Sequence, residues 1–159
     1  MGSINGSTAV ITGGASGIGR ALAERFALEG ARLVLADVEE GALDETVAQL
    51  AAGGAEVLGV RCDVADLAQV EALRDAALER FDAVHYVFNN AGVTGGSAAT
   101  SPRPIWDWVV GVNLLGVVNG VQAFLPVLAA QNEGHLVNTA SVAGFAGVPG
   151  MGPYCATKA

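Results

Sequence analysis

The sequence predicts a doubly wound α/β fold, in which helices cover both faces of a parallel sheet. Strand-like and helix-like segments alternate along the whole chain, and a glycine-rich turn joins the first strand to the first helix. Hydrophobic residues make up 52% of the chain and charged residues only 15%, which is typical of strands buried on both faces. The 159 residues fall within the ~100–200 of a single domain, so we expect one domain over residues 1–159.

The first strand and the first helix frame the glycine turn. Residues 7–12 form a short β-prone apolar run, and residues 20–27 have helical composition and spacing. Between them, Gly13, Gly17 and Gly19 would let the backbone turn sharply and approach a pyrophosphate, which the positive end of the helix would hold. In isolation the segment fits a mobile glycine loop equally well.

The second predicted strand ends in an acidic residue, Asp37, whose spacing from the glycine turn is informative. Residues 32–36 form the strand, and Asp37 follows 18 residues after Gly19, close to the ~20-residue offset at which an acidic residue meets the adenosine ribose in dinucleotide folds. Asp37 would repel a 2′-phosphate, and the turn has no Lys or Arg before Arg20 to compensate, so NAD is the expected cofactor. The alternative role for Asp37 is a helix N-cap or turn residue.

The rest of the chain continues the alternation. Helices are expected over residues 41–52, 67–80 and 106–130, and strands over residues 56–61, 83–88 and 136–139. Residues 94–104 are small, polar and proline-bearing and predict an exposed loop. A last helix is expected to begin near Pro153, a residue suited to a first turn.

The stretch over residues 108–130 approaches the ~20 apolar residues of a transmembrane helix. Asn113, Asn119, Gln122 and Pro126 interrupt it, and basic residues are missing from its flanks. We therefore expect a soluble helix buried on most sides and no membrane partner. An apolar helix of this kind on a small domain needs a cover, so we expect a homodimer or homotetramer.

The net charge, the N-terminal segment and the spacing of the Cys and His residues argue against several functions. The net charge is −8 without a basic cluster, which argues against nucleic acid as a partner. The N-terminus lacks the basic and apolar regions of a signal peptide, and we expect a cytoplasmic protein with reduced thiols. Cys62, Cys155, His85 and His135 have no metal-ligand spacing, so no metal site is expected, and a nucleophilic role for Cys155 is a remote alternative.

Tyr154 and Lys158 stand four residues apart at the start of the last expected helix. That spacing brings two side chains onto one helix face, where the ammonium would stabilise the ionised phenol and make it a proton shuttle. Alone, this pair is weak evidence, because Tyr and Lys meet at this spacing by chance on many helices.

Taken together, the motifs resemble those of the short-chain dehydrogenase/reductase family over almost the whole chain. Thr12-Gly13-x-x-x-Gly17-Ile18-Gly19 is similar to the family's cofactor loop, Asp63-Val64 to its adenine-contacting pair, and Asn89-Asn90-Ala91-Gly92 to the turn beside the cofactor. The resemblance implies a Rossmann fold with the strand order 3-2-1-4-5. The cofactor-binding residues it implies are Gly13, Ser16, Gly17, Ile18, Gly19, Asp37, Asp63, Val64, Asn90, Ala91, Gly92, Tyr154 and Lys158.

The same resemblance implies a catalytic tetrad of Asn113, Ser141, Tyr154 and Lys158. Tyr154 would be the general acid/base, Ser141 would bond the substrate oxygen, Lys158 would bind the nicotinamide ribose, and Asn113 would support a water in the proton relay. The implied reaction interconverts a secondary alcohol and a ketone. Asn113 as a helix-bending residue and Ser141 as a loop hydroxyl are the structural alternatives.

One departure from the family pattern concerns the end of the chain. Family members continue past the Tyr/Lys helix into two further strands and the loop that covers the substrate, so we expect the domain to be incomplete at its C-terminus and its fifth strand to be an uncovered edge. A truncated, catalytically incompetent dinucleotide-binding or assembly module is therefore the alternative function.

Overall fold

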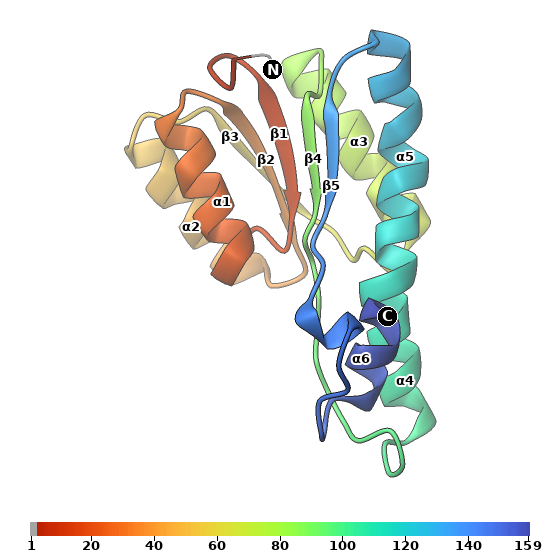
Figure 1. The fold of residues 1–159 in the computed structure, drawn as a ribbon. Coiled ribbons are helices and arrows are strands. Elements are labelled where there is room, and N and C mark those ends of the chain that lie inside the picture. The colour runs from red at the N-terminus through yellow and green to blue at the C-terminus, as the bar shows by residue number, and fades with distance from the viewer. Residues whose placement is uncertain (1–2) are drawn as a thin grey trace.

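A computed structural model describes residues 3–159 and contains one parallel sheet with the strand order β3-β2-β1-β4-β5 (Figure 1). Its strands are β1 (Thr8–Thr12), β2 (Arg32–Asp37), β3 (Val57–Arg61), β4 (Tyr86–Asn89) and β5 (His135–Asn138). The predicted doubly wound fold and its strand order are confirmed. The winding direction reverses between β1 and β4, the place where such sheets bind ligands at the carboxyl ends of their strands.

Helices cover both faces of the sheet, as Figure 1 shows. The helices α1 (Gly17–Leu28) and α2 (Glu40–Ala52) pack on one face, and α3 (Leu67–Phe81) and α5 (Gly116–Gln131) on the other. Two shorter helices, α4 (Arg103–Val110) and α6 (Gly152–Lys158), lie beyond the carboxyl ends of the strands (Figure 1). A π-helical segment η1 (Gly111–Leu115) joins α4 to α5, and a 3₁₀ turn η2 (Val142–Gly144) precedes α6.

The core lies on either side of β1, whose five residues are all buried. Alternate side chains of β1 enter different clusters: Val10 packs with α3 and α5, and Ile11 packs with α1 and α2. The apolar run in the first expected strand is thus explained by burial on both faces. The strand order places β3 and β5 at the two edges of the sheet.

The helix expected over residues 106–130 begins three residues earlier, at Arg103. Pro104, which the sequence analysis placed in an exposed loop, lies in the first helical turn, where its missing N–H costs no hydrogen bond. The continuation through η1 is π-helical around Asn113. Pro126 lies inside α5 on its exposed side, where water can reach the carbonyl that it leaves unbonded.

The expectation that this long helix is buried on most sides is wrong for this chain. Gly116, Gly120, Ala123, Phe124 and Leu128 face the sheet and α3, whereas the opposite side is bare. The continuous helical stretch Arg103–Gln131 is long and apolar enough to cross a membrane, with 33% of its most apolar window buried. Core helices of soluble proteins pass the same test, and the absence of a membrane partner stays a prediction.

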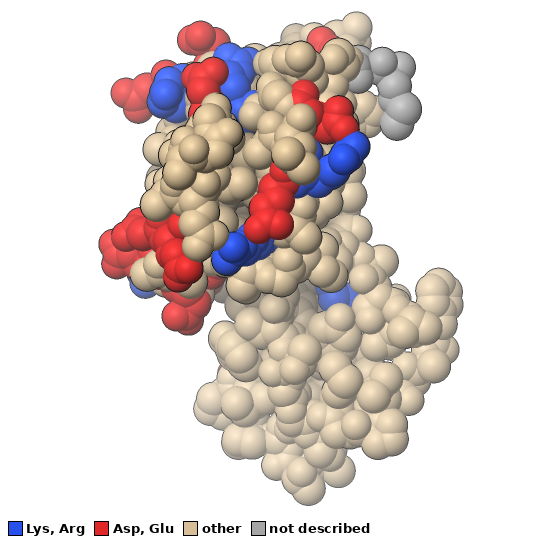
Figure 2. All heavy atoms as spheres, turned by 90° about the vertical axis from the view of Figure 1, so that its left-hand side faces the viewer, with Lys and Arg blue, Asp and Glu red and all other residues tan. Residues whose placement is uncertain are grey.

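Charge is distributed unevenly over the molecule. Figure 2 shows acidic and basic side chains gathered over α1 and α2, while the part below the sheet is almost free of charge. The sequence explains the contrast, because only Arg103, Asp107, Glu133 and Lys158 are charged after Asp82. Apart from the Arg103–Asp107 ion pair on α4 and Lys158 on α6, the surfaces around these helices and the loops between them are therefore apolar or neutral.

Candidate functional site

A cleft of about 710 Å³ opens at the carboxyl ends of the strands. It is lined by residues from every strand end and from α1, α4, η1 and α6. The cofactor-binding residues predicted from the sequence line it with the exception of Gly19, which lies buried beneath the turn. Of the predicted catalytic residues, Tyr154 and Lys158 line the cleft, whereas Asn113 and Ser141 are not among its lining residues.

The glycine turn is shaped by close backbone contacts. Gly13 has φ = +65° and Gly17 has φ = +52°, conformations that side chains rarely adopt. A Cβ on Gly19 would lie 2.0 Å from the Gly13 carbonyl oxygen, so only glycine fits there. Ser16, Gly17 and Ile18 remain exposed at the start of α1, and among the described residues no side chain caps that helix start. Its first amide groups are therefore available to an anion.

Asp37 ends β2 beside this turn and is partly buried. Its Oδ2 accepts a hydrogen bond from the Ala15 amide at 3.1 Å, and its Oδ1 accepts one from the Glu39 amide at 3.2 Å. The turn role left open in the sequence analysis is therefore real, and the same carboxylate also lines the cleft. Its role toward a ribose stays a prediction.

The turn Asn89–Gly92 is fixed to the end of β1 through Thr12. The Thr12 hydroxyl accepts hydrogen bonds from the Asn90 and Ala91 amides at 3.0 and 3.1 Å, and the Asn90 Nδ2 donates to the Thr12 carbonyl at 3.0 Å. Asp63 and Val64 are held on the opposite wall, where the Asn119 Nδ2 donates to the Val64 carbonyl at 2.8 Å. The two walls of the cleft are thus rigidly tied to the sheet and to α5.

Tyr154 and Lys158 come together on α6 as their spacing predicts. The Lys158 ammonium lies 5.8 Å from the centroid of the Tyr154 ring, and it donates a hydrogen bond to the Thr139 carbonyl at 2.8 Å. The Thr139 hydroxyl in turn donates to the Asn90 Oδ1 at 3.2 Å. Through this chain of contacts α6 is anchored to the ends of β5 and β4.

Asn113 contacts α6, and Ser141 caps the 3₁₀ turn that precedes it. In the π-helical segment, the Asn113 side chain accepts from the Val93 amide and donates to the Val93 carbonyl, both at 2.8 Å, and its Nδ2 lies 3.2 Å from the Thr157 hydroxyl. Ser141 caps η2 by accepting from the Ala143 amide at 3.2 Å. The loop-hydroxyl alternative for Ser141 is therefore realised, whereas Asn113 lies in a π-helical segment, and the roles of both residues in a reaction stay predictions.

Sequence reasoning missed several residues that line the cleft: Val38, Glu39, Arg61, Cys62, Val93, Thr94, Trp108, Val112 and Thr139. Arg61 matters most, because the register of β2 and β3 pairs it with Asp37 and brings a positive charge to the acidic end of the cleft. Sheet register links it to Asp37, a relation that spacing along one strand does not reveal. Strand ends, read together, are the signal that would have found Arg61 and Thr139.

Cys62 is the lining residue with a large electrostatic perturbation. Burial, and then the carboxylates of Asp63 and Asp66, raise the pKa of the Cys62 thiol to about 11. The group is therefore a protonated, unreactive thiol near neutral pH. Within residues 3–159, Cys62 and Cys155 are both free, and no cluster of His, Cys, Asp or Glu could hold a metal ion.

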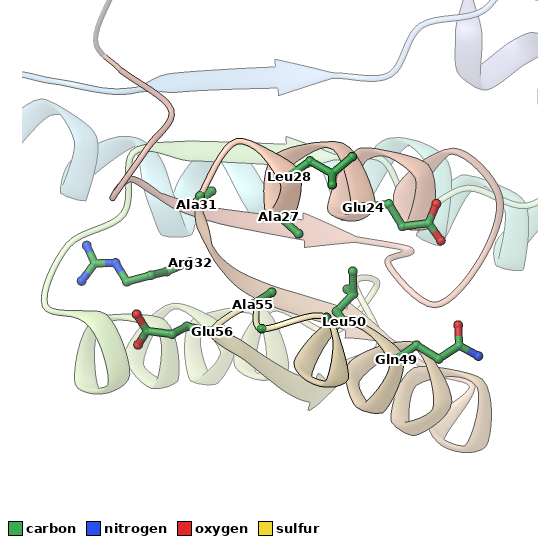
Figure 3. A pocket seen from close by; sticks show the side chains of 12 residues that line it. Glu24, Ala27, Leu28, Ala31, Arg32, Gln49, Leu50, Ala55 and Glu56 are labelled. Atoms are coloured by element: carbon green, nitrogen blue, oxygen red, sulfur yellow. The ribbon is translucent and has the colours of Figure 1, made fainter.

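A second cavity, of about 360 Å³, lies between the carboxyl ends of α1 and α2 (Figure 3). Leu28 and Leu50 face it from the two helices, while Arg32 and Glu56 lie beside the beginnings of β2 and β3. It sits at the amino ends of the strands, opposite to the glycine turn. Because doubly wound sheets bind their ligands at the carboxyl ends, the large cleft is the candidate site.

Comparison with known proteins agrees with this geometry. The pattern of the family described as short chain dehydrogenase matches residues 7–159. SadH of Mycobacterium tuberculosis is 43% identical over 159 residues, covering 99% of this chain and 58% of SadH, and levodione reductase of Leifsonia aquatica is 44% identical over 153 residues, covering 94% and 57%. The crystal structure of a short chain dehydrogenase/reductase from Burkholderia phymatum in complex with NAD has 57% identity and a TM-score of 0.97, covering 99% of this chain and 57% of that one.

The chain thus spans somewhat more than half the length of these relatives. The match nevertheless extends over the glycine turn, the sheet and the Tyr154/Lys158 helix. This chain belongs to the short chain dehydrogenase family.

Proposed function

We propose that the protein is an NAD-dependent oxidoreductase that interconverts a secondary alcohol and a ketone. The observation that carries the proposal is one cleft with a glycine turn and Asp37 at one end and the Tyr154/Lys158 pair at the other. A dinucleotide is an extended molecule that needs contacts along such a length. The NAD complex of the Burkholderia relative supports the choice of cofactor.

The residues of the cleft fit this cofactor. A Cβ would fill the space that Gly19 leaves beside Gly13, and the exposed amides at the start of α1 suit a pyrophosphate. Asp37 would accept hydrogen bonds from the adenosine ribose, Asp63 and Val64 would flank the adenine, and the segment 90–92 would lie against the nicotinamide half. When bound, NAD accepts or returns a hydride at the nicotinamide ring.

Residues of the chain itself transfer the proton of the substrate hydroxyl. In alcohol oxidation, the Tyr154 phenol oxygen takes the proton from the substrate hydroxyl, and in ketone reduction it gives that proton back. The Lys158 ammonium stabilises negative charge on the phenol oxygen and binds the nicotinamide ribose. Ser141 would orient the substrate oxygen, and Asn113 would hold the proton-relay water and the segment around Val93 that borders the cleft.

A second copy of this chain is the proposed cover for the bare side of α4 and α5. Trp108, Leu114, Leu115, Val118 and Leu125 are exposed there, an apolar surface that soluble proteins bury in an interface. We propose a homodimer or homotetramer on this basis. The two free cysteines support the further proposal of a reducing, cytoplasmic location.

The alternative is a dinucleotide-binding or assembly module without turnover. The exposed edge strand β5 favours it. The full-length protein separates the two functions when it is incubated with NAD⁺ and a panel of secondary alcohols, and formation of reduced cofactor is followed by absorbance. The oxidoreductase oxidises at least one alcohol of the panel, whereas a protein that binds NADH without any turnover is a binding module.

A further inference from the structure

The peptide groups of Ala15, in the middle of the glycine turn, are held from two sides. The Ala15 amide donates to the Asp37 carboxylate at 3.1 Å, and the Ala15 carbonyl accepts a hydrogen bond from the Thr46 hydroxyl at 3.0 Å. The preceding amide, that of Gly14, donates to the Ala36 carbonyl at 3.1 Å. The base of the turn is therefore fixed, while its tip at Ser16, Gly17 and Ile18 stays exposed.

Thr46 is an unusual source for one of these bonds. It lies in the middle of α2, and a helical threonine commonly bonds a carbonyl one turn back in its own helix. Here the hydroxyl reaches a residue 31 positions earlier in the chain. The side chain is 1% exposed, so water cannot take its place as a donor.

The next residue, Val47, lies on the same turn of α2 but contacts Gly59 of β3. Its Cγ2 would be 2.9 Å from a Cβ placed on Gly59, so Val47 packs over β3. Of these two adjacent residues, Thr46 bonds the glycine turn through its hydroxyl, whereas the apolar side chain of Val47 cannot donate such a bond. This difference provides a matched control.

We propose that Thr46 is a positioning residue for the cofactor: it holds the Ala15 carbonyl so that the amides at the start of α1 point at the pyrophosphate. This inference rests on the proposed binding of NAD. Thr46 would not touch the cofactor, because it is buried behind the turn and does not line the cleft. It acts by keeping the turn in the conformation that binds.

The size of the effect follows from a population shift. Without the hydroxyl, the Ala15 carbonyl loses its donor, and the turn populates conformations that point it toward water. The apparent dissociation constant rises by the inverse of the fraction that stays competent. One hydrogen bond of ordinary strength biases such an equilibrium by roughly 2- to 12-fold, which sets the largest factor by which NADH affinity should weaken.

The test compares Thr46→Val, Thr46→Ser and Val47→Ala in the full-length protein. Dissociation constants for NADH, ADP-ribose and adenosine are measured by calorimetric titration, and the free energy of unfolding is measured by urea denaturation. Thr46→Val should weaken the binding of NADH and of ADP-ribose by the same measurable factor, at most about 12-fold, and should leave adenosine binding unchanged, because adenosine carries no phosphate. Thr46→Ser should restore the affinity. Val47→Ala should destabilise the fold and leave all three affinities unchanged.

The possible results separate the inference about Thr46 from the proposed function. If Thr46→Val binds NADH as tightly as the unmodified protein, the inference about Thr46 is wrong and the proposed function is unaffected. Equal weakening of adenosine, or the same loss in Val47→Ala, also overturns the inference, because the effect would then be general disturbance of α2. If the unmodified protein does not bind NADH at all, the proposed function fails and the inference falls with it.

Discussion

The two edge strands of the sheet differ in how far this chain covers them. At one edge, β3 is partly buried along most of its length, and Val47 of α2 lies directly over Gly59. At the other, β5 exposes His135, Val137 and Asn138, and Phe145 in the following loop is 95% exposed. The β3 edge is therefore covered by contacts within the chain, whereas the β5 edge and the loop after it carry apolar surfaces that this chain leaves bare.

The same contrast holds for the side chains that follow Asp82. Four charged residues stand in that part of the sequence, together with most of the large apolar side chains that the structure exposes. Those are Trp108, Leu114, Leu115, Val118, Leu125, Val137, Val142, Phe145 and Val148. The charged part before Asp82, which contains the glycine turn, and the apolar part after it can be tested separately.

The largest effect is expected when residues 1–159 are produced alone. The bare edge of β5 and the exposed apolar side chains should drive association, and turnover should be absent. Gel filtration with light scattering and an assay of NAD⁺ reduction measure both properties. A monodisperse 16.0 kDa preparation with dehydrogenase activity would show that the β5 edge and the exposed apolar side chains need no further protein to cover them.

Tyr154→Phe should come next, with an effect confined to chemistry. Removing the phenol hydroxyl takes away the transferable proton and keeps the ring, so turnover of the full-length enzyme should fall by about 10²–10⁴-fold. NADH affinity, measured by titration, should change little. Lys158→Ala is the contrasting variant, because it should reduce both turnover and NADH affinity. Unchanged turnover in Tyr154→Phe would remove this residue from the mechanism.

Gly19→Ala should lower both the stability of the fold and the affinity for NADH, because it disturbs the glycine turn. Its new methyl group would lie 2.0 Å from the Gly13 carbonyl oxygen, and such overpacking typically costs ~1–3 kcal/mol of unfolding free energy. NADH affinity should fall as the turn shifts. Gly41→Ala is the control, since a Cβ there meets no atom within 4 Å and the position lies in the exposed first turn of α2. If the two variants had equal stability and equal NADH affinity, the claim that a side chain at position 19 is excluded by crowding would be wrong.

The smallest effect concerns the two thiols. Because the pKa of Cys62 is raised to about 11 and the side chain is 2% exposed, it stays protonated and shielded at pH 8. Iodoacetamide should therefore alkylate the partly exposed Cys155 well before Cys62 in the folded protein. Peptide mass spectrometry over a time course measures both rates. Faster modification of Cys62 would mean that the wall of the cleft opens in solution.

Much of the candidate site could be predicted from local sequence. The glycine turn, Asp37 and the Tyr154/Lys158 pair follow from strand and helix periodicity and from spacing within one βαβ unit or one helical turn. These signals are local because the backbone geometry that they require is local. The strand order came from the resemblance to the family and not from spacing.

What could not be predicted depends on contacts between distant segments. Arg61 reaches the cleft through the register of β2 and β3, and the Thr46 hydroxyl bonds a residue 31 positions away. The π-helical segment around Asn113 reflects its bonds to Val93 and Thr157. The bare side of α5 was misjudged, because apolar composition predicts that a helix is covered without saying by which chain.

Competitive titration of the full-length protein with NADH and NADPH tests the central claim most directly. Asp37 lines the cleft, and its carboxylate would repel a 2′-phosphate, although Arg61 lies across from it on β3. We expect NADH to bind more tightly than NADPH, with the difference narrowed in Asp37→Ala. Tighter binding of NADPH to the unmodified protein, or no binding of either, would contradict the account.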